Sequence, residues 1–411
     1  MKHISTFLFV SLISIVASNP GLVHAGTTTL ETFDAQPPIH GTTDASSTSP
    51  KGMTPAEIKT AYHLPRTGGS GTIAIITAYH HPQTESDLAV FNKQFSLAPC
   101  TVANKCLETH EMSTSTKTNE NWSFETALDT EWAHAIAPAA KILVVEARSS
   151  KGSDLIKAVD YARNRAGVVS VSMSWGGNEF PTETKLDSHF ATTTTNKFIT
   201  YFASSGDDGT GANWPAVSPK VIAVGGTSLT MKRNTASSSW TFASEKAWAG
   251  SGGGLSLYET QPSYQKIYSI SQSNGRRAIP DVSYAADPTK GFSVYHSKNQ
   301  DESSKRMSVF LSTASSAPST SSKNTPEKNG WYVIGGTSAG APQWAAIAAL
   351  GMAGQHPLSL TTIYNDKASA TYSKYFRDIV SGKNGTCSYY CVARKHYDFV
   401  TGLGSPLTDL Y

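Results

Sequence analysis

The sequence predicts an α/β fold: a doubly wound, mainly parallel sheet with helices on both faces. Short apolar runs, typical of buried strands, alternate with segments of helical periodicity. The run at 71–76 follows glycines and is apolar throughout, as in parallel strands that are covered on both faces. Turns rich in glycine, serine and aspartate follow several of these runs. Because ligands of open α/β sheets bind at the carboxyl edge, we expect the functional residues at these turns.

The first predicted helix covers 53–62, where Thr54 is a good N-cap and Pro55 suits the first helical position. Apolar runs and periodicity then predict the other elements. In chain order these are strand 71–76, helix 85–95, helix 121–137, strand 141–146, helix 153–163, strand 168–173, a weak helix 182–195, strand 198–203, strand 221–224, strand 331–334 and the alanine-rich helix 343–350.

Segment 1–25 has the pattern of a secretory signal peptide. Lys2 and His3 precede an apolar run over 4–16, and a small-residue cleavage pattern ends at Ala25. We therefore expect a secreted protein. No later stretch approaches the length of a membrane span, so we expect no membrane association.

Composition divides the remaining chain into three parts. Residues 26–51 are rich in Thr, Ser and Pro and poor in apolar residues, which predicts a flexible lead segment. Residues 52–411 are long enough for one large domain with a sizeable core. Within that domain, 296–330 is rich in Ser, Thr and Lys and predicts a long surface insertion.

Charge and cysteine content argue against two classes of function. The formal net charge is +3 without a dense run of Lys or Arg, so nucleic-acid binding is not indicated. The 4 cysteines form two close pairs, Cys100/Cys106 and Cys387/Cys391, and lack the C-x-x-C units of zinc sites. Two local disulfides in an oxidising compartment fit this spacing better.

Ser338 lies in a glycine-rich turn between the strand 331–334 and the alanine-rich helix. Such a turn exposes the hydroxyl and directs the backbone N–H outward beside the positive end of the helix. A nucleophilic serine and a developing oxyanion need that combination. The alternative is a simple helix N-cap.

Glu125 and Asp129 are four residues apart on a predicted helix, and this spacing places both carboxylates on one face. The neighbouring apolar residues indicate that the helix is largely buried. Two carboxylates in a poorly solvated cleft would share a proton, and one pKa would be raised. The alternative is a solvated acidic helix start.

Two more strand ends carry polar turns. Asp207 follows the strand 198–203 between glycines, where an Asx turn is the structural alternative. The segment 172–177 ends another strand, with a backbone free to pair with an extended peptide.

The order of these motifs resembles the sedolisin (serine-carboxyl peptidase) family, which has a subtilisin-like fold. The motifs are E-x-x-x-D at 125–129, S-x-S-W-G at 172–176, S-G-D-x-G at 205–209 and G-T-S-A-x-x-P at 336–342, with further matches at 248–256 and 277–283. The resemblance covers about residues 52–411 and implies a peptidase catalytic domain there.

The resemblance implies a role for each candidate residue: Ser338 as nucleophile, Glu125 as its general base, Asp129 as the carboxylate behind the base, and Asp207 as the acid of the oxyanion hole. A carboxylate base still works in acid, where histidine is largely protonated. A protonated Asp207 could donate a hydrogen bond to the oxyanion. The resemblance therefore implies an acid-acting endopeptidase with protein or peptide substrates, and we expect a monomer.

The family also binds calcium in a C-terminal loop, which the resemblance places at 376–404. Two carboxylates plus backbone carbonyls make a hard-oxygen site. The implied ligands are Asp378, Ile379, Arg394, His396 and Asp398, although the family has glycines where Arg394 and His396 stand. The alternative is two turn aspartates.

Two other functions are compatible with the same scaffold. A catalytically inactive secreted binding protein would be expected to have lost one of the four catalytic residues, and all are present. An ordinary subtilase would carry a histidine–glycine–threonine helix start, whereas this chain has His80-His81-Pro82. Family members carry a large folded propeptide, and the chain as given has room only for a short tail before the domain.

Overall fold

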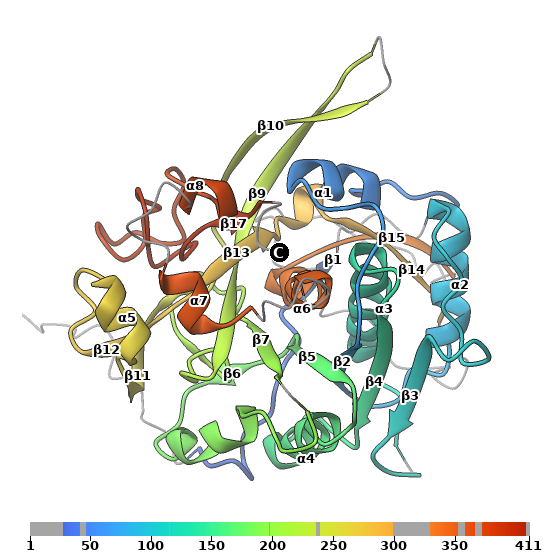
Figure 1. The fold of residues 1–411 in the computed structure, drawn as a ribbon, viewed down its shortest axis with the longest axis horizontal. Coiled ribbons are helices and arrows are strands. Elements are labelled where there is room, and N and C mark those ends of the chain that lie inside the picture. Colours follow the sequence, from blue (N-terminus) through green and yellow to red (C-terminus); the bar gives the residue numbers. More distant parts are fainter. Residues whose placement is uncertain are drawn as a thin grey trace, which may run out of the picture.

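The computed structural model describes residues 28–41, 47–114, 116–196, 198–235, 239–298, 329–351, 358–365 and 372–407 (Figure 1). The predicted signal peptide lies outside these residues, as does 299–328 of the expected surface insertion. His296 and Gly330, the two ends of the expected insertion, belong to buried strands of the domain.

Among the described residues there are eight α-helices: five lie close to their predicted positions, and those at 263–268, 360–365 and 372–375 were not predicted. They are α1 (Pro55–Ala61), α2 (Thr84–Phe95), α3 (Glu120–Ile136), α4 (Gly152–Arg163), α5 (Ser263–Tyr268), α6 (Gly340–Gly351), α7 (Leu360–Asn365) and α8 (Tyr372–Tyr375). Short 3-10 helices cover Glu183–Phe190, Pro288–Lys290 and Thr337–Ala339. At α1, Thr54 and Glu57 form a capping box with Pro55 in the first turn, which explains why this helix could be predicted locally.

The strands include several that the sequence did not predict. They are β1 (His40–Gly41), β2 (Thr72–Ala78), β3 (Leu107–Glu111), β4 (Lys141–Ala147), β5 (Val168–Met173), β6 (Gly177–Asn178), β7 (Thr200–Ser204), β8 (Asn213–Trp214), β9 (Val221–Arg233), β10 (Trp240–Ala247), β11 (Gly254–Thr260), β12 (Arg276–Ile279), β13 (Val282–Ala285), β14 (Phe292–His296), β15 (Gly330–Gly335), β16 (Phe376–Arg377) and β17 (Ser405–Pro406).

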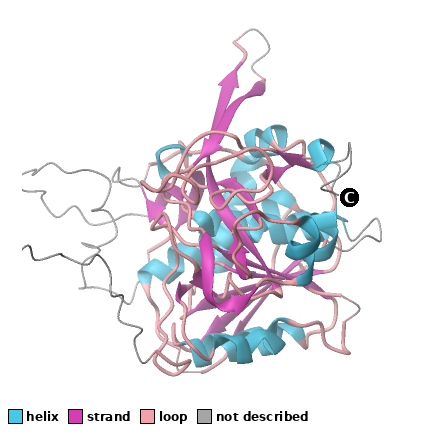
Figure 2. Cartoon of the chain, turned by 90° about the vertical axis from the view of Figure 1, so that its left-hand side faces the viewer, coloured by secondary structure: helices cyan, strands magenta, loops and turns pink. Residues whose placement is uncertain are grey.

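The central sheet has eight strands in the order β10-β9-β7-β5-β2-β4-β3, with β13 also paired to β9. All of its pairs are parallel except β9 with β10. These two strands form a long hairpin that projects from the body of the molecule (Figure 2). The observed sheet confirms the predicted doubly wound, mainly parallel architecture.

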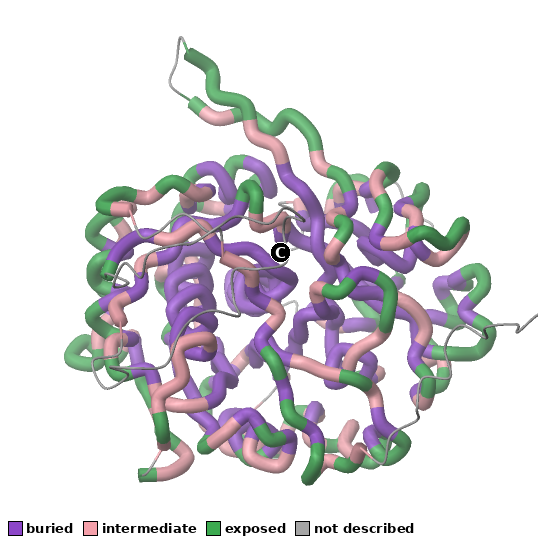
Figure 3. The backbone as a smooth tube through the Cα atoms, turned by 180° about the vertical axis from the view of Figure 1, so that it is seen from behind, coloured by how far each residue is buried: buried purple, intermediate pink, exposed green. Residues whose placement is uncertain are grey.

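Apolar side chains on both faces of the sheet form two separate cores. On β2, Ile73 and Ile75 join the core beneath α3 and α6, whereas Ala74 and Ile76 join the core beneath α4. Successive side chains of a strand point to opposite faces, so a continuous apolar run is needed when both faces are covered. The helical coils at the centre of Figure 3 are buried along their length.

The apolar run at 331–334 belongs to a different sheet from the other predicted strands. Strand β15 pairs antiparallel with β14 on one side and with β1 on the other. This small three-stranded sheet ends directly before the turn that carries Ser338.

The lead segment differs from the expectation of a flexible tail in the part that is described. Residues 33–41 lie against the domain, and Phe33, Ala35 and Ile39 are buried. Backbone hydrogen bonds join this stretch to Ser150 and Gly176. Composition alone misses such contacts, because they use main-chain groups that every residue carries.

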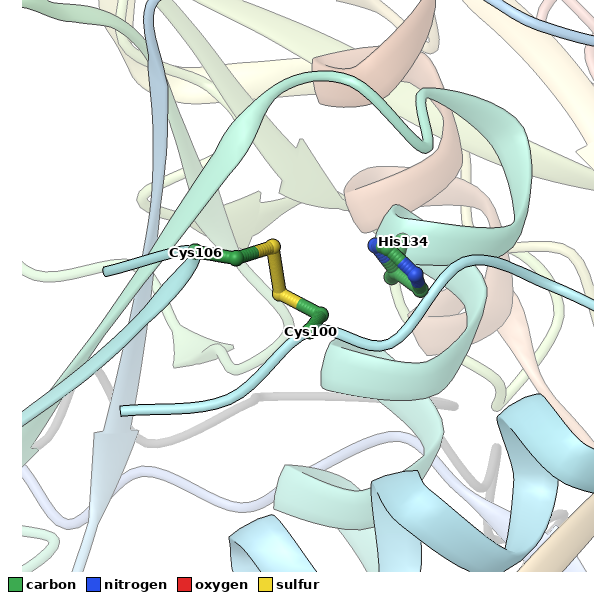
Figure 4. Close-up of side chains that lie close together, drawn as sticks. All are labelled: Cys100, Cys106 and His134. Carbon is green, nitrogen blue, oxygen red and sulfur yellow. A yellow bond between two sulfur atoms is a disulfide. The ribbon is translucent and has the colours of Figure 1, made fainter. Parts of the chain in front are cut away.

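Both cysteine pairs are joined locally, as predicted: Cys100 with Cys106 and Cys387 with Cys391. His134, on α3, lies next to the first disulfide (Figure 4). Its Nε2 lies 2.9 Å from the carbonyl oxygen of Ala98. Because both sulfurs are held in the disulfide, this group does not offer thiolate ligands to a metal. Among the described residues, no helix has the length and apolar character that crossing a membrane requires.

Candidate active site

A strand, a tight turn and a helix place Ser338 at the carboxyl end of β15. The chain turns at Gly336, whose φ is 120°, and passes through the 3-10 turn Thr337–Ala339 into α6. A methyl group on Gly336 would lie 2.2 Å from the carbonyl oxygen of Pro38 and 2.5 Å from Asp207 Oδ2. Glycine is therefore required both by the positive φ and by the crowding around the turn.

Helix α3 presents two carboxylates to this serine. The hydroxyl of Ser338 donates a hydrogen bond to Glu125 Oε2 at 2.9 Å. Asp129 follows one turn later on the same helix face, and its carboxyl group lies close enough to that of Glu125 for the two to interact electrostatically. All three side chains are fully buried. The structure thus brings Ser338 together with a carboxyl pair from a distant part of the sequence, and these three residues were predicted as one site.

Burial changes the acid strength of both carboxyl groups. Loss of solvation raises the pKa of Glu125 well above its ordinary value, and the neighbouring Asp129 charge raises it further. Burial also raises the pKa of Asp129. Two carboxyl groups in contact inside a protein cannot both ionise easily, so the pair retains a shared proton.

Ser174 connects the carboxyl pair to the serine turn. Its hydroxyl lies within hydrogen-bond distance of Asp129 Oδ1 at 2.8 Å and of the Ser338 carbonyl oxygen at 3.2 Å. The S-x-S-W-G motif placed Ser174 at a strand end, but sequence reasoning considered only its backbone. The signal that could have revealed this contact is a small hydroxyl residue directly after a buried strand.

Asp207 lies on the other side of the serine turn. Its Oδ1 accepts hydrogen bonds from the Thr337 backbone N–H at 2.8 Å and from the Thr337 hydroxyl at 2.7 Å. Burial raises the pKa of Asp207, while the hydrogen bond from His40 opposes that rise. His40 Nε2 lies 3.0 Å from Asp207 Oδ2, and this contact raises the pKa of His40.

The Ser338 backbone N–H points toward the same space as Asp207. It donates to the Pro38 carbonyl oxygen at 3.4 Å, and both Pro38 O and Asp207 Oδ2 crowd Gly336. The Ser338 hydroxyl, paired with a carboxylate, thus lies near a backbone N–H and a second carboxyl group. Acyl transfer needs this arrangement of nucleophile, base and oxyanion donors.

A model of the Subtilase family matches residues 113–370 of the sequence, which is more than half of the chain. The chain belongs to the subtilase family. The family is one of serine-type peptidases, and its fold agrees with the central sheet described above.

Two relatives connect this subtilase to the sedolisin type. Sedolisin of Pseudomonas sp. (strain 101) is 28% identical over 387 residues, which is 86% of this chain and 60% of sedolisin. Kumamolisin of Bacillus sp. (strain MN-32) is 26% identical over 386 residues, which is 88% of this chain and 63% of kumamolisin. The subtilase thus spans about three fifths of the length of these relatives. The matches support the sedolisin-like, subtilisin-fold resemblance seen in the motifs.

A solved structure supports the same fold. It is Pseudomonas sedolisin, described as a serine-carboxyl proteinase complexed with two molecules of pseudo-iodotyrostatin. The two structures superpose with a TM-score of 0.66 at 24% identity, covering 87% of the subtilase and 96% of that chain. At this identity the likeness concerns the fold.

The predicted calcium residues lie together near the C-terminus of the subtilase. Asp378 accepts the backbone N–H of His396 at 2.9 Å, and Asp398 accepts that of Arg394 at 3.1 Å. Ile379 is buried beside these loops. The structure therefore brings the five predicted residues into one loop cluster.

These residues fit a hard divalent cation in the chemistry of their donors. In the part of the chain that the structure describes, neither Asp378 nor Asp398 forms an ion pair with Lys or Arg. Burial raises the pKa of Asp398 to about 7, although hydrogen bonds from the backbone N–H groups of Arg394, Val400 and Thr401 oppose this rise. Calcium prefers carboxylate and carbonyl oxygens, and two carboxylates with neighbouring backbone carbonyls offer it such donors.

Proposed function

We propose that this subtilase is a serine-carboxyl endopeptidase that hydrolyses peptide bonds in acidic surroundings. The observation that carries the proposal is the 2.9 Å hydrogen bond from the Ser338 hydroxyl to Glu125 Oε2. A serine hydroxyl is a weak nucleophile until a base accepts its proton. The names of the relatives, sedolisin and kumamolisin, support the same class of reaction.

In the proposed reaction, Ser338 Oγ attacks the carbonyl carbon of the scissile bond while its proton moves to Glu125. Asp129 shares a proton with Glu125 and holds that carboxyl group in place. When the tetrahedral intermediate collapses, the C–N bond breaks and the amine departs with the proton from Glu125. Water then attacks the acyl-enzyme by the reverse proton path, which releases the acid and restores Ser338.

Asp207 and the Ser338 backbone N–H are the proposed oxyanion donors. A protonated Asp207 donates a hydrogen bond, whereas an ionised one would repel the developing negative charge. The raised pKa of Asp207, caused by burial, supports a proton on this group over a wider pH range. This requirement for a protonated acid is the reason for proposing activity in acid.

Calcium and secretion complete the proposal. Asp378 and Asp398, with backbone carbonyls of Ile379, Arg394 and His396, would hold one structural calcium ion. When bound, the ion would neutralise two carboxylates at the C-terminal loops. The two local disulfides support folding in an oxidising compartment, as expected for a secreted protein.

The test is a digest of denatured haemoglobin or casein between pH 2 and pH 9. Wild type should digest with an acidic optimum, and Ser338→Ala and Glu125→Gln should each lose at least a thousandfold in kcat, within the range seen when triad members are removed. Glu131→Gln is the matched control, because Glu131 is also buried on α3 but receives the Tyr295 N–H instead of the serine hydroxyl. It should retain activity.

The second candidate is an inactive binding protein on the same scaffold. It would bind peptides without cleaving them, so wild type and Ser338→Ala would give the same lack of digestion. An ordinary subtilase would instead peak above neutral pH. Either result would refute the proposed serine-carboxyl mechanism.

A further inference from the structure

A histidine and two glutamates that the proposed reaction does not use lie together at the carboxyl ends of three neighbouring strands. His80 follows β2, Glu146 lies near the end of β4, and Glu111 ends β3; the sheet order of these strands is β2-β4-β3 (Figure 1). One ligand atom from each of the three side chains lies within 4.8 Å of the others. The motif His80-His81-Pro82, which differs from that of an ordinary subtilase, thus supplies one member of this group.

The register of the sheet places the two glutamates on the same face. Glu111 and Glu146 are direct partners in the parallel pair of β3 and β4. Alternate residues of a strand point to the same face. Leu107 on β3 and Val144 on β4, which belong to the core beneath α3, therefore mark the face on which Glu111 and Glu146 lie. Both carboxylates are on the α3 side of the sheet.

His80 completes the group from the turn after β2. Tyr79 lies in the left-handed region with a φ of 64°, which a bulky residue rarely adopts, and the turn directs His80 toward Glu146. His80 Nδ1 lies 2.7 Å from Glu146 Oε2 and 3.7 Å from Glu111 Oε1. The other Glu146 oxygen, Oε1, accepts the His81 backbone N–H at 2.9 Å, which fixes the orientation of this fully buried carboxylate.

The charges of this group are not balanced by a basic side chain. In the described parts of the chain, neither Glu111 nor Glu146 forms an ion pair with Lys or Arg. A buried carboxylate is unfavourable without a positive charge beside it. Protonated His80 supplies one positive charge for two carboxylates, whereas a divalent cation compensates both and is bound by the neutral imidazole. Zinc accepts imidazole nitrogen and carboxylate oxygen together, whereas calcium takes oxygen ligands.

We propose that His80, Glu111 and Glu146 bind one zinc ion at this edge of the sheet. Ligand atoms that share a tetrahedral zinc ion lie roughly 3.4 Å apart, which is between the two distances measured from His80 Nδ1. The side chains of His80 and Glu111 are 30% and 39% exposed, so they have room to adjust and leave a fourth position for water. The His80 backbone N–H donates to the Lys117 carbonyl oxygen at 2.9 Å. The ion would therefore join three strand ends beside the chain that enters α3.

Isothermal titration calorimetry of zinc into the Ser338→Ala protein tests this site without self-digestion. The protein is first cleared of metals with a chelator and then saturated with calcium, so that sites made only of oxygen ligands are filled. The hydrogen bond with Glu146 raises the pKa of His80, so the titration is run at pH 8 to favour the neutral imidazole. One zinc ion per chain should bind. The same titration with magnesium should give no binding at this site, because magnesium prefers oxygen ligands in an octahedron.

Four variants in the same Ser338→Ala background show which residues hold the ion. His80→Ala and Glu111→Gln should each weaken zinc binding at least tenfold, since losing a mere outer partner of a ligand usually costs about 10- to 100-fold. Glu111→Gln keeps the side-chain volume at an exposed position, so it still decides the question if His80→Ala does not fold. His110→Ala and Glu108→Gln are the matched controls, because both residues lie on β3 but on its opposite face. They should bind zinc like their parent.

Melting curves give a second measurement on the same proteins. Zinc should raise the melting temperature of the Ser338→Ala protein, because it binds the native state, and Glu111→Gln should abolish or reduce that rise. The proposal is overturned if the calcium-saturated protein binds no zinc, if Glu111→Gln binds zinc as tightly as its parent, or if His110→Ala loses the ion instead. These measurements do not use peptide cleavage, so their outcome and that of the proposed peptidase activity are independent.

Discussion

The Ser174 hydroxyl lies 2.8 Å from Asp129 Oδ1 and 3.2 Å from the carbonyl oxygen of Ser338. One side chain at the end of β5 therefore contacts both the carboxyl pair of α3 and the turn of the nucleophile. Because Ser174 contacts both α3 and the serine turn, we expect it to hold Asp129 and Ser338 in position for the proposed reaction. Burial raises the pKa of Asp129, and the hydrogen bond from Ser174 opposes this rise.

Ser174→Ala should reduce kcat by about 10- to 100-fold, since a hydrogen bond to a charged group contributes roughly 1.5–3 kcal/mol. Because the lost bond had favoured ionised Asp129, the acidic limb of the pH–rate profile should move to higher pH. Ser172→Ala is the matched control: Ser172 is buried on the same strand, and its hydroxyl has no hydrogen-bond partner among the described residues. An unmoved acidic limb in Ser174→Ala would contradict the positioning role.

Replacing Asp207 separates the serine-carboxyl mechanism from that of other subtilases. If protonated Asp207 donates to the oxyanion, activity must fall as this group ionises, which produces the alkaline limb of the pH–rate profile. Asp207→Asn supplies a donor that does not titrate, so the alkaline limb should move up or disappear. Asp207→Ala should cost about 10²–10³ in kcat, the usual effect of losing one oxyanion donor. Full activity of Asp207→Ala would show that the assignment is wrong.

Without calcium, the fold should lose stability as the pH rises from about 4 to about 7. Burial raises the pKa of Glu259 and of Asp398 each to about 7. Unfolding returns these groups to about 4, so the native state binds more protons in this window and the free energy of unfolding falls with pH. For the almost fully buried Asp398, the loss is of the order of 2–4 kcal/mol at about 1.4 kcal/mol per pKa unit.

Urea denaturation in a chelator at pH 4 and pH 7 measures this dependence. Asp398→Asn should flatten it, whereas Asp208→Asn, at an exposed position, should not. A stability that rises steadily from pH 4 to pH 7 would contradict the expected sign.

Calcium should raise the melting temperature at neutral pH through Asp378 and Asp398. Binding only to the native state adds roughly 2.7 kcal/mol when the free ion is a hundredfold above Kd. Differential scanning fluorimetry with calcium and with a chelator should show the difference in wild type and its loss in Asp398→Ala. The same melting temperature in both buffers would mean that these residues are only turn aspartates.

Breaking the buried pair Arg277–Asp281 by removing one partner should strongly destabilise the fold. Both side chains are fully buried, with the Arg277 Nη2 to Asp281 Oδ2 distance at 2.5 Å. Removing one partner leaves an uncompensated charge, so Arg277→Leu should lower the free energy of unfolding by about 3–5 kcal/mol. Arg165→Leu, which breaks the exposed pair with Glu108, should cost about 1 kcal/mol or less. Similar losses in both variants by urea denaturation would refute this difference.

Much of the fold could be predicted from local patterns. The α1 helix begins at Pro55 because Thr54 and Glu57 cap it, and β2 is apolar throughout because both of its faces are covered. The four-residue spacing of Glu125 and Asp129 places both on one helix face wherever that helix packs. Motif order was enough to group these two residues with Asp207 and Ser338.

Other features were decided only by tertiary structure. Strand β15 was predicted as an apolar run, but its partners β1 and β14 come from distant parts of the chain. The role of Ser174 depends on the meeting of β5, α3 and the serine turn. The lead segment has the composition of a flexible tail, yet its backbone pairs with Gly176 and with β15, and the Phe33 ring packs against Trp214. Local propensity is encoded by neighbouring residues, whereas these contacts form through main-chain groups and buried surfaces that become adjacent only when the chain has folded.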